Sequence, residues 1–214
     1  PLEKFHGTAT SSIIAGRKDD IDIPKNMHGI AFDSQILFVA IELGSPPSDG
    51  EYEPLAISEF TWEAYDEAES KFYREMASKT SIVNNSFGFT GQITDYSKDQ
   101  LESTFPKFIN ALEDSDETIF VWSAGNYNGI TDADGITVEA SNPGILAGLG
   151  YYFPELAKNN VAVVAIDKEG SIANFSNRCG VTKEFCIAAP GVRVPLAIPN
   201  NLFASLSEKE KAGF

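Results

Sequence analysis

Short apolar runs, each of the length of a single strand, recur along the chain. They cover residues 35–43, 81–86, 118–124, 161–166 and 185–188. The first run reads Gln-Ile-Leu-Phe-Val-Ala-Ile-Glu-Leu and is followed by Gly44 and, shortly after, by two prolines. A run with so little polar alternation is typical of a strand that is buried on both faces. We therefore predict a strand at each of these places.

Between the runs, apolar residues recur at helical spacing. The pattern predicts helices over residues 8–15, 57–78 and 98–112, and a helical or compact segment over residues 144–157. The apolar face predicted for the helix over 57–78 contains Phe60, Ala64, Ala68, Phe72 and Met76. The acidic face of that helix, which we expect to be solvated, contains Glu59, Glu63, Asp66, Glu67, Glu69 and Glu75. The inward face predicted for the helix over 98–112 contains Leu101, Phe105, Phe108, Ile109 and Leu112.

Strands that alternate with helices indicate an α/β domain, with a mostly parallel sheet and helices on both faces. A chain of 214 residues is long enough for one such domain and for a sizeable core. In sheets of this kind, the chemistry lies where strands end in glycine-rich turns at the carboxyl edge. The candidate functional residues are therefore sought in those turns.

The charge balance of the chain argues against several classes of partner. Its 16 Lys and Arg against 31 Asp and Glu give a formal net charge of −15. Nucleic acid and anionic lipid both require a basic face, so we expect no nucleic-acid partner. No apolar run approaches the roughly 18 residues of a membrane helix, so we expect no membrane contact by this segment. A hydrophobic content of 43% is too high for a disordered acidic chain.

The two cysteines, Cys179 and Cys186, are seven positions apart. This spacing fits a small disulfide loop formed in an oxidising compartment. Two free buried thiols are the alternative. A metal site is less well supported, because two thiolates need two further ligands and neither His6 nor His28 has a matching spacing.

Several turns at the ends of predicted elements contain residues that can perform chemistry. His6-Gly7-Thr8 precedes a helix start made of small residues, and residues 83–88 run from a strand into a glycine-ended edge. Such an edge can pair with an extended peptide by strand addition. Each motif also has an ordinary interpretation, because a lone His is often a surface or capping residue and a strand can simply end.

Two further turns follow later in the chain. Ser123-Ala124-Gly125-Asn126 ends a predicted buried strand and places an amide donor over a groove, where it would suit a developing oxyanion. An Asn that merely satisfies a turn is the alternative. Phe175-Ser176-Asn177 and, after the cysteine loop, Ala188-Ala189-Pro190-Gly191 complete the series.

Taken in this order, the motifs resemble those of the subtilisin-like serine proteases. The likeness extends from His6 to about Val192. It implies that His6 is the general base of an Asp/His/Ser triad and that Asn126 is the oxyanion-hole side chain. It also implies a substrate-binding site, with a backbone rail and the wall of the first specificity pocket. The rail is Ser86, Phe87 and Gly88, and the wall is Ala124 and Gly125.

The resemblance further implies an Asp and a Ser for which the sequence shows no matching motif. The family's Asp lies in an Asp-Ser/Thr-Gly turn before the His motif, and its Ser lies in Gly-Thr-Ser-Met-Ala after Ala-Pro-Gly. We therefore expect residues 1–214 to be the central part of a subtilisin-like protease domain, an incomplete fragment. It would lack the Asp-bearing strand before residue 1 and the Ser-bearing helix after residue 214. Such a fragment should be inactive alone and should expose sheet surface that favours strand-swapped self-association.

The function implied by the resemblance is that of a serine endopeptidase, which cleaves a protein or peptide substrate through an acyl-enzyme. The small disulfide loop and the acidic insertions look most like the passenger proteases of Gram-negative autotransporters. That likeness implies a secreted protein or one on the bacterial cell surface. The alternative is a non-catalytic subtilase-like module that keeps the peptide groove for binding or assembly.

Other ligands have weaker support. We expect no cofactor and no metal, although calcium is common in the family. The acidic residues Asp132 and Asp134 show no spacing typical of calcium ligands. A nucleotide-binding α/β domain is poorly supported, because no predicted strand leads into a phosphate-binding glycine motif.

Overall fold

The computed structural model describes residues 6–18, 28–39, 61–131 and 135–195. The chain divides into two compact units, which are described separately below. The first comprises residues 1–50 and 193–214, and the second comprises residues 51–192.

Helix α1 (His6–Ala15) of the first unit confirms the helix predicted over residues 8–15. The chain then returns along the end of this helix, where Gly29 N–H donates to the Gly16 carbonyl at 2.8 Å. A further backbone bond joins Ile30 N–H to the Ile13 carbonyl at 3.1 Å.

The strand predicted over residues 35–43 is wrong for its described part, residues 35–39. These residues form no strand, and Ile36, Leu37, Phe38 and Val39 are all exposed. Residues 40–43 lie outside the described part of the chain. An apolar run indicates that burial would be favourable, but a buried strand also needs paired neighbours, and residues 35–39 have none among the described strands.

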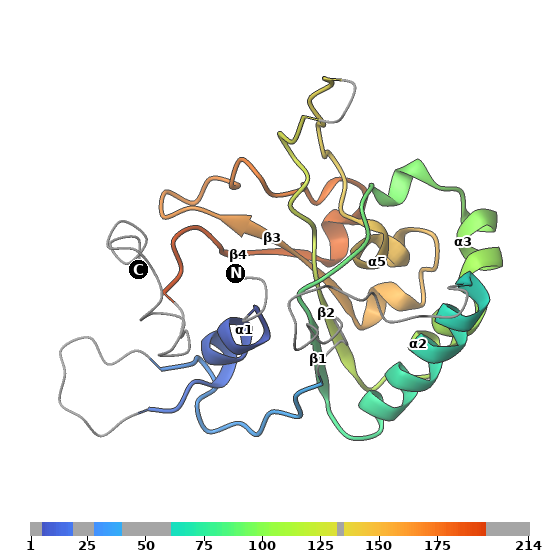
Figure 1. Ribbon diagram of the computed structural model, residues 1–214, viewed down its shortest axis with the longest axis horizontal. Helices are drawn as coiled ribbons and strands as arrows, with labels where there is room; N and C mark the ends of the chain where they lie inside the picture. The colour runs from blue at the N-terminus through green and yellow to red at the C-terminus, as the bar shows by residue number, and fades with distance from the viewer. Residues whose placement is uncertain (1–5, 19–27, 40–60, 132–134, 196–214) are drawn as a thin grey trace, which may run out of the picture. The chain divides into compact units, whose positions relative to one another are not determined.

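The second unit contains a parallel sheet of four strands in the order β1-β2-β3-β4 (Figure 1). The strands are β1 (Ile82–Asn85), β2 (Ile119–Ser123), β3 (Asn160–Ile166) and β4 (Cys186–Pro190). They confirm four of the predicted strands and the α/β class with a parallel sheet. Because all neighbours are parallel, their carboxyl ends lie at one edge.

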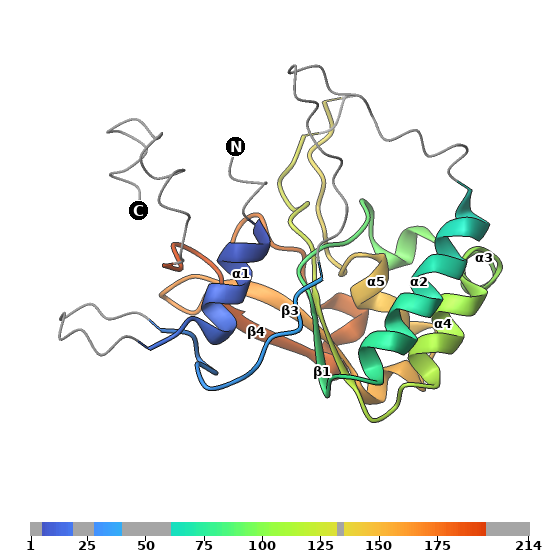
Figure 2. The ribbon, with the colours of Figure 1, turned by 60° about the horizontal axis from the view of Figure 1, so that its bottom comes forward.

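The helices of this unit cluster beside the sheet, and Figure 2 shows α2, α3 and α4 side by side. They are α2 (Trp62–Ala77), α3 (Lys98–Thr104), α4 (Pro106–Glu113) and the short α5 (Ile145–Gly148). The shorter 3-10 helices are η2 (Ile93–Asp95), η3 (Leu149–Tyr151), η4 (Leu156–Lys158) and η5 (Gly180–Phe185).

The single helix predicted over 98–112 is wrong in one respect, because the structure has two helices there. The break falls at Phe105, directly before Pro106, which has no N–H to continue a helix and disfavours helical backbone in the preceding residue. The five residues predicted to point inward from this segment are nevertheless all buried.

An aromatic cluster joins the helices to one face of the sheet. Trp122 of β2 is fully buried and stacks on Tyr73 of α2, with ring centroids 5.6 Å apart and ring planes at 27°. Phe108 of α4 lies edge-on to the same indole at 6.4 Å. Burial raises the pKa of Tyr73 well above its ordinary value, so the phenol stays protonated and its hydroxyl donates to Asn85 Oδ1 at 2.8 Å.

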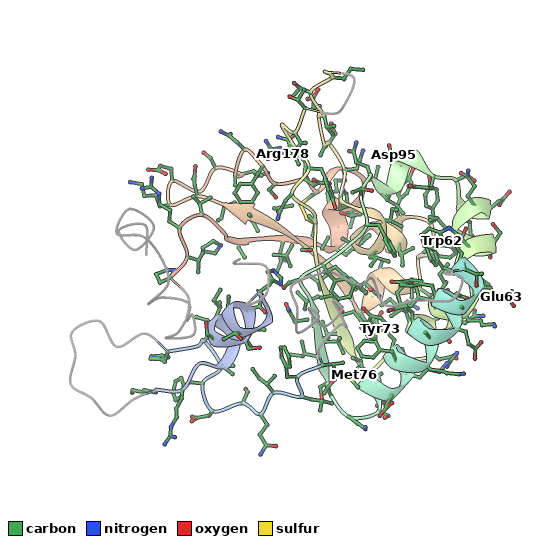
Figure 3. The ribbon with its side chains drawn as sticks, viewed as in Figure 1. Trp62, Glu63, Tyr73, Met76, Asp95 and Arg178 are labelled. Atoms are coloured by element: carbon green, nitrogen blue, oxygen red, sulfur yellow. A yellow bond between two sulfur atoms is a disulfide. The ribbon has the colours of Figure 1, made fainter. Side chains whose placement is uncertain are left out.

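Helix α2 is oriented differently from the prediction. Its buried residues are Asp66, Ser70, Tyr73 and Met76, whereas Ala64 and Ala68 of the predicted apolar face are exposed. Asp66, which was expected on the solvated face, is only 2% exposed. Figure 3 shows Tyr73 and Met76 on the inner side of this helix.

The reason for this orientation is a contact between the Asp66 carboxylate and the first turn of α4. The carboxylate accepts hydrogen bonds from Lys107 N–H at 3.1 Å and from Phe108 N–H at 2.8 Å. Phe105, at the N-cap position of α4, provides no side-chain cap of its own. Asp66 therefore caps α4 from another helix and places a negative charge at its positive end.

A solvent-facing ion pair adds to this helix–helix contact. Lys107 Nζ lies 2.6 Å from Glu67 Oε2, and Lys71 of α2 lies 2.8 Å from the other carboxylate oxygen. The hydrogen bonds from Lys107 and Lys71 lower the pKa of Glu67 to about 2. Because this pair is in water, its contribution is small beside that of the buried Asp66.

We predict that Asp66→Ala lowers the free energy of unfolding by about 2–4 kcal/mol, because two N–H groups lose the buried carboxylate that accepts from them. Asp66→Asn keeps one acceptor and should lose about 1–2 kcal/mol. Urea denaturation followed by circular dichroism measures both values. Glu63→Ala, an exposed acidic residue of the same helix, is the control and should change stability by about 0.5 kcal/mol or less. Equal effects of Asp66→Ala and Glu63→Ala would contradict the capping role.

Candidate functional site

A hollow of about 270 Å³ lies at the carboxyl ends of β1 and β2, within the second unit. Its walls are residues 86–89, residues 123–127 and residues 144–147. The candidate oxyanion-hole and substrate-binding residues of the second unit all line this hollow. They are Ser86, Phe87, Gly88, Ala124, Gly125 and Asn126.

One wall continues from β1 in an extended direction. Ser123 Oγ lies 3.4 Å from the Phe87 carbonyl, and Ser86 Oγ accepts from Asn84 Nδ2 at 2.9 Å. In the described part of the chain, the backbone of Gly88 makes no hydrogen bond to other backbone groups. No atom approaches within 4 Å of the position that a Cβ would take on Gly88. An open backbone of this kind can pair with a peptide strand.

The opposite wall is made by the start of α5. Gly144 N–H donates to the Ala124 carbonyl at 2.7 Å, and this bond attaches the helix to the end of β2. Ile145, Leu146 and Ala147 follow and are buried. The sequence predicts a helical or compact segment over residues 144–157, which agrees with α5, but it does not predict that the start of this segment lines the pocket. The signal available was Pro143-Gly144 followed by an apolar helix start.

The lining of the hollow has no charged side chain. Phe87, Phe89 and the α5 residues give it apolar walls, while polar groups are confined to the strand ends. Such a site accommodates an uncharged side chain and holds a chain segment through its polar rim.

Asn126 lies in a turn that requires glycine beside it. Gly125 has φ +113°, and a Cβ there would lie 3.0 Å from Asn177 Nδ2. The Asn126 side chain is exposed at the hollow, and its amide has no hydrogen-bond partner among the residues that the structure describes. It is therefore a donor available to a ligand in the hollow.

The structure contains the disulfide between Cys179 and Cys186, whose Cα atoms are 5.8 Å apart. The closed loop carries η5 and leads into β4. Gly180 in this loop lies against Asn142, and Val181 N–H donates to Asn142 Oδ1 at 3.0 Å. The disulfide loop is thus joined to the segment that precedes α5.

His6 is the first residue of α1 in the first unit, and its side chain is exposed. Its backbone carbonyl accepts from Thr10 Oγ1 at 3.1 Å. Because Asn126 belongs to the second unit, the two candidate catalytic residues are described in separate units.

No group of three or more His, Cys, Asp or Glu side chains that could hold a metal ion occurs in the described ranges. Asp132 and Asp134 lie outside those ranges.

Comparison with known proteins assigns the family. The subtilase family matches residues 2–211. This chain belongs to the subtilase family. The assignment covers both units, so His6 and Asn126 lie within a single family match.

Two curated relatives of this subtilase match about a third of it. Serotype-specific antigen 1 of Mannheimia haemolytica is 45% identical over 74 residues, which is 35% of this chain and 7% of the relative. An extracellular serine protease of Serratia marcescens is 32% identical over 73 residues, or 34% of this chain and 6% of the relative. The matches therefore span only a small part of either relative's length.

Solved structures similar to this subtilase include the prenylagaramide maturation protease PagA, with a TM-score of 0.40 and 20% identity. That likeness covers 66% of this chain and 42% of PagA. The PatG macrocyclase in complex with peptide has a TM-score of 0.40 and 17% identity, covering 63% of this chain and 34% of that one.

We predict that Gly125→Ala lowers the free energy of unfolding by about 2 kcal/mol or more, because the new Cβ meets Asn177 and the positive φ strains an alanine. Gly88→Ala is the matched control at the same hollow, since its Cβ would meet nothing within 4 Å. It should change stability by about 0.5 kcal/mol or less. Thermal or urea unfolding of the two variants measures the difference. A Gly125→Ala variant as stable as Gly88→Ala would show that the turn has another conformation.

Proposed function

We propose that this subtilase acts as a serine endopeptidase of the subtilisin type, which hydrolyses peptide bonds in a protein or peptide through an Asp/His/Ser triad. The observation that supports this most directly is the single hollow lined by Ser86–Gly88, Ala124, Gly125 and Asn126. Family membership supports the reaction type.

In the proposed mechanism, the substrate backbone pairs with Ser86, Phe87 and Gly88. The side chain before the scissile bond enters the hollow beside Ala124 and Gly125. Its apolar walls favour an uncharged side chain.

His6 then removes the proton from the nucleophilic serine hydroxyl as that oxygen attacks the scissile carbonyl, and later delivers it to the leaving amine. The Asn126 Nδ2 group donates to the oxyanion of the tetrahedral intermediate. Neither the family's Asp turn nor its Ser motif has a counterpart in these 214 residues. We propose that both groups come from other parts of a longer protein and that the present chain is inactive alone. No step in this mechanism requires a metal ion.

A non-catalytic peptide-binding or assembly module is the second candidate. The open backbone of Gly88 beside an apolar hollow favours peptide binding whether or not cleavage follows. The two candidates differ in whether a reactive serine is delivered to Asn126.

The proposed location is outside the cell or on the bacterial surface, as in an autotransporter passenger protease. The disulfide supports an oxidising compartment. One relative's name describes an extracellular protease, and the other's describes an antigen. Among the described helices, none has the length and apolar character needed to cross a membrane.

The first experiment labels the protein from its native source with a serine-directed fluorophosphonate and measures intact mass. We predict label on a polypeptide larger than 23.2 kDa that contains this sequence, or on a separate piece that purifies with it. Either result supports the protease. An unlabelled but folded full-length protein would instead favour the peptide-binding module.

In the active protein, we predict that His6→Ala abolishes peptide cleavage, because the serine loses its base. Asn126→Ala should lower kcat by about 10²–10³-fold, the known cost of removing the oxyanion donor of subtilisin. Steady-state kinetics on a fluorogenic peptide measures both effects. Asn174→Ala, which removes an exposed amide outside the hollow, should leave kcat within about twofold. An unchanged rate in His6→Ala or Asn126→Ala would remove that residue from its proposed role.

A further inference from the structure

Asn177 is fully buried directly behind the turn that carries Asn126. Its side-chain Oδ1 accepts a hydrogen bond from Tyr127 N–H at 2.9 Å, and its backbone N–H donates to the Gly125 carbonyl at 2.9 Å. These bonds hold the backbone on both sides of Asn126.

From these contacts we infer that Asn177 is a positioning residue, which fixes the backbone from which the Asn126 side chain reaches into the hollow. The inference rests on the proposed function, since the direction of this amide affects a rate only if it meets an oxyanion. A donor held rigidly before the reaction stabilises developing charge without reorganising, and displacement by about 1 Å can cost a hundredfold in rate.

The chemistry of the site explains why the residue is an asparagine. While Oδ1 accepts from Tyr127, Nδ2 donates to the Asn142 carbonyl at 3.1 Å. A carboxylate could replace the acceptor but not the donor, and alanine replaces neither. A Cβ on Gly125 would lie 3.0 Å from Nδ2 of this amide, which is closer than an ordinary van der Waals contact.

Asn142 connects this arrangement to the rest of the unit. Its backbone N–H donates to Gln92 Oε1 at 2.7 Å, and its own Oδ1 accepts from Val181 in the disulfide loop. Arg178, labelled in Figure 3, follows Asn177 and donates from its backbone N–H to the Ala140 carbonyl at 2.9 Å. Asn177 is therefore also held by residues that lie outside the hollow's walls.

The test uses the active full-length protein and compares Asn177→Ala, Asn126→Ala and the double variant. Because Asn177 acts through Asn126, Asn177→Ala should lower kcat by about 10- to 100-fold with KM nearly unchanged. In the Asn126→Ala background, it should lower kcat no further. A residue that only stabilises the fold would reduce the rate in both backgrounds, so equal losses would overturn the inference.

Amide hydrogen exchange provides a second measurement that needs no activity. Exchange at Tyr127 N–H should become on the order of tenfold faster in Asn177→Ala, while Ala124 N–H, which bonds to the Val163 carbonyl in the sheet, stays protected. Asn177→Asp keeps the acceptor for Tyr127 and should retain most of this protection. Asn174→Ala is the matched control and should exchange as the unchanged protein does.

The two measurements separate the two ideas. A folded protein without cleavage would contradict the proposed function, and the exchange result would still decide whether Asn177 holds the turn. Unchanged exchange at Tyr127 in Asn177→Ala would overturn the inference even in an active protease. If Asn177→Ala does not fold, Asn177→Asp takes its place. Because it keeps the acceptor for Tyr127, it should keep both the protection of Tyr127 N–H and most of kcat, and a folded Asn177→Asp variant that loses that protection would overturn the inference.

Discussion

The buried indole of Trp122 is the contact on which the arrangement of the strand ends depends. It stacks on Tyr73 of α2, and its Nε1–H donates to Asn160 Oδ1 of β3 at 2.7 Å. The Tyr73 hydroxyl in turn bonds to Asn85 at the end of β1. Burial of two large rings supplies most of the free energy here, and the two hydrogen bonds, worth about 1 kcal/mol each, select the register. Ser86 and Ala124 of the hollow follow Asn85 and Trp122 within two residues, so their positions come from this packing.

In the loops beyond the strand ends, hydrogen bonds from asparagine side chains, rather than aromatic packing, hold the backbone in place. The Asn128 side chain accepts from Ala140 N–H and donates to the Asn174 carbonyl, and Asn177 does the same for Tyr127 and Asn142. These loops have no regular ladder, so their buried backbone groups need side-chain partners. Among the described residues, every buried side-chain nitrogen or oxygen atom also has a hydrogen-bond partner. The turn around Asn126 is rigid for this reason.

Much of this fold could be predicted from the sequence because it follows from local pattern. The four strands of the sheet and the inward residues Leu101, Phe108 and Leu112 have clear apolar periodicity. The wrong predictions for residues 35–39 and for Asp66 share one cause, which is that the local pattern of a segment does not show which other segments it contacts. Asp66 is placed on a polar stripe by periodicity, but it is buried because α4 begins next to it. The break at Phe105 has a local signal in Pro106, although the apolar periodicity continues across it.

For the candidate site, the sequence indicates which residues line the hollow but not the contacts that hold them. Motif order indicated the residues that line the hollow, because each motif ends a strand and the strands are parallel. The contacts of Asn177 are not predictable from the sequence, although its motif, Phe175-Ser176-Asn177, is visible there. Its role depends on contacts with Gly125 and Tyr127, some 50 residues earlier in the chain. No periodicity reports a contact across that separation.

The rigidity of the Asn126 turn bears on the choice between catalysis and simple peptide binding. A binding groove needs the open backbone at Gly88 and the apolar hollow, and both would serve equally well beside a flexible turn. Here the residues on either side of Asn126 are fixed by a fully buried amide, while its own amide is left without a partner among the described residues. An exposed amide on a backbone held in this way is of use when a charge develops in front of it. This arrangement therefore supports the proposed protease more than the binding module.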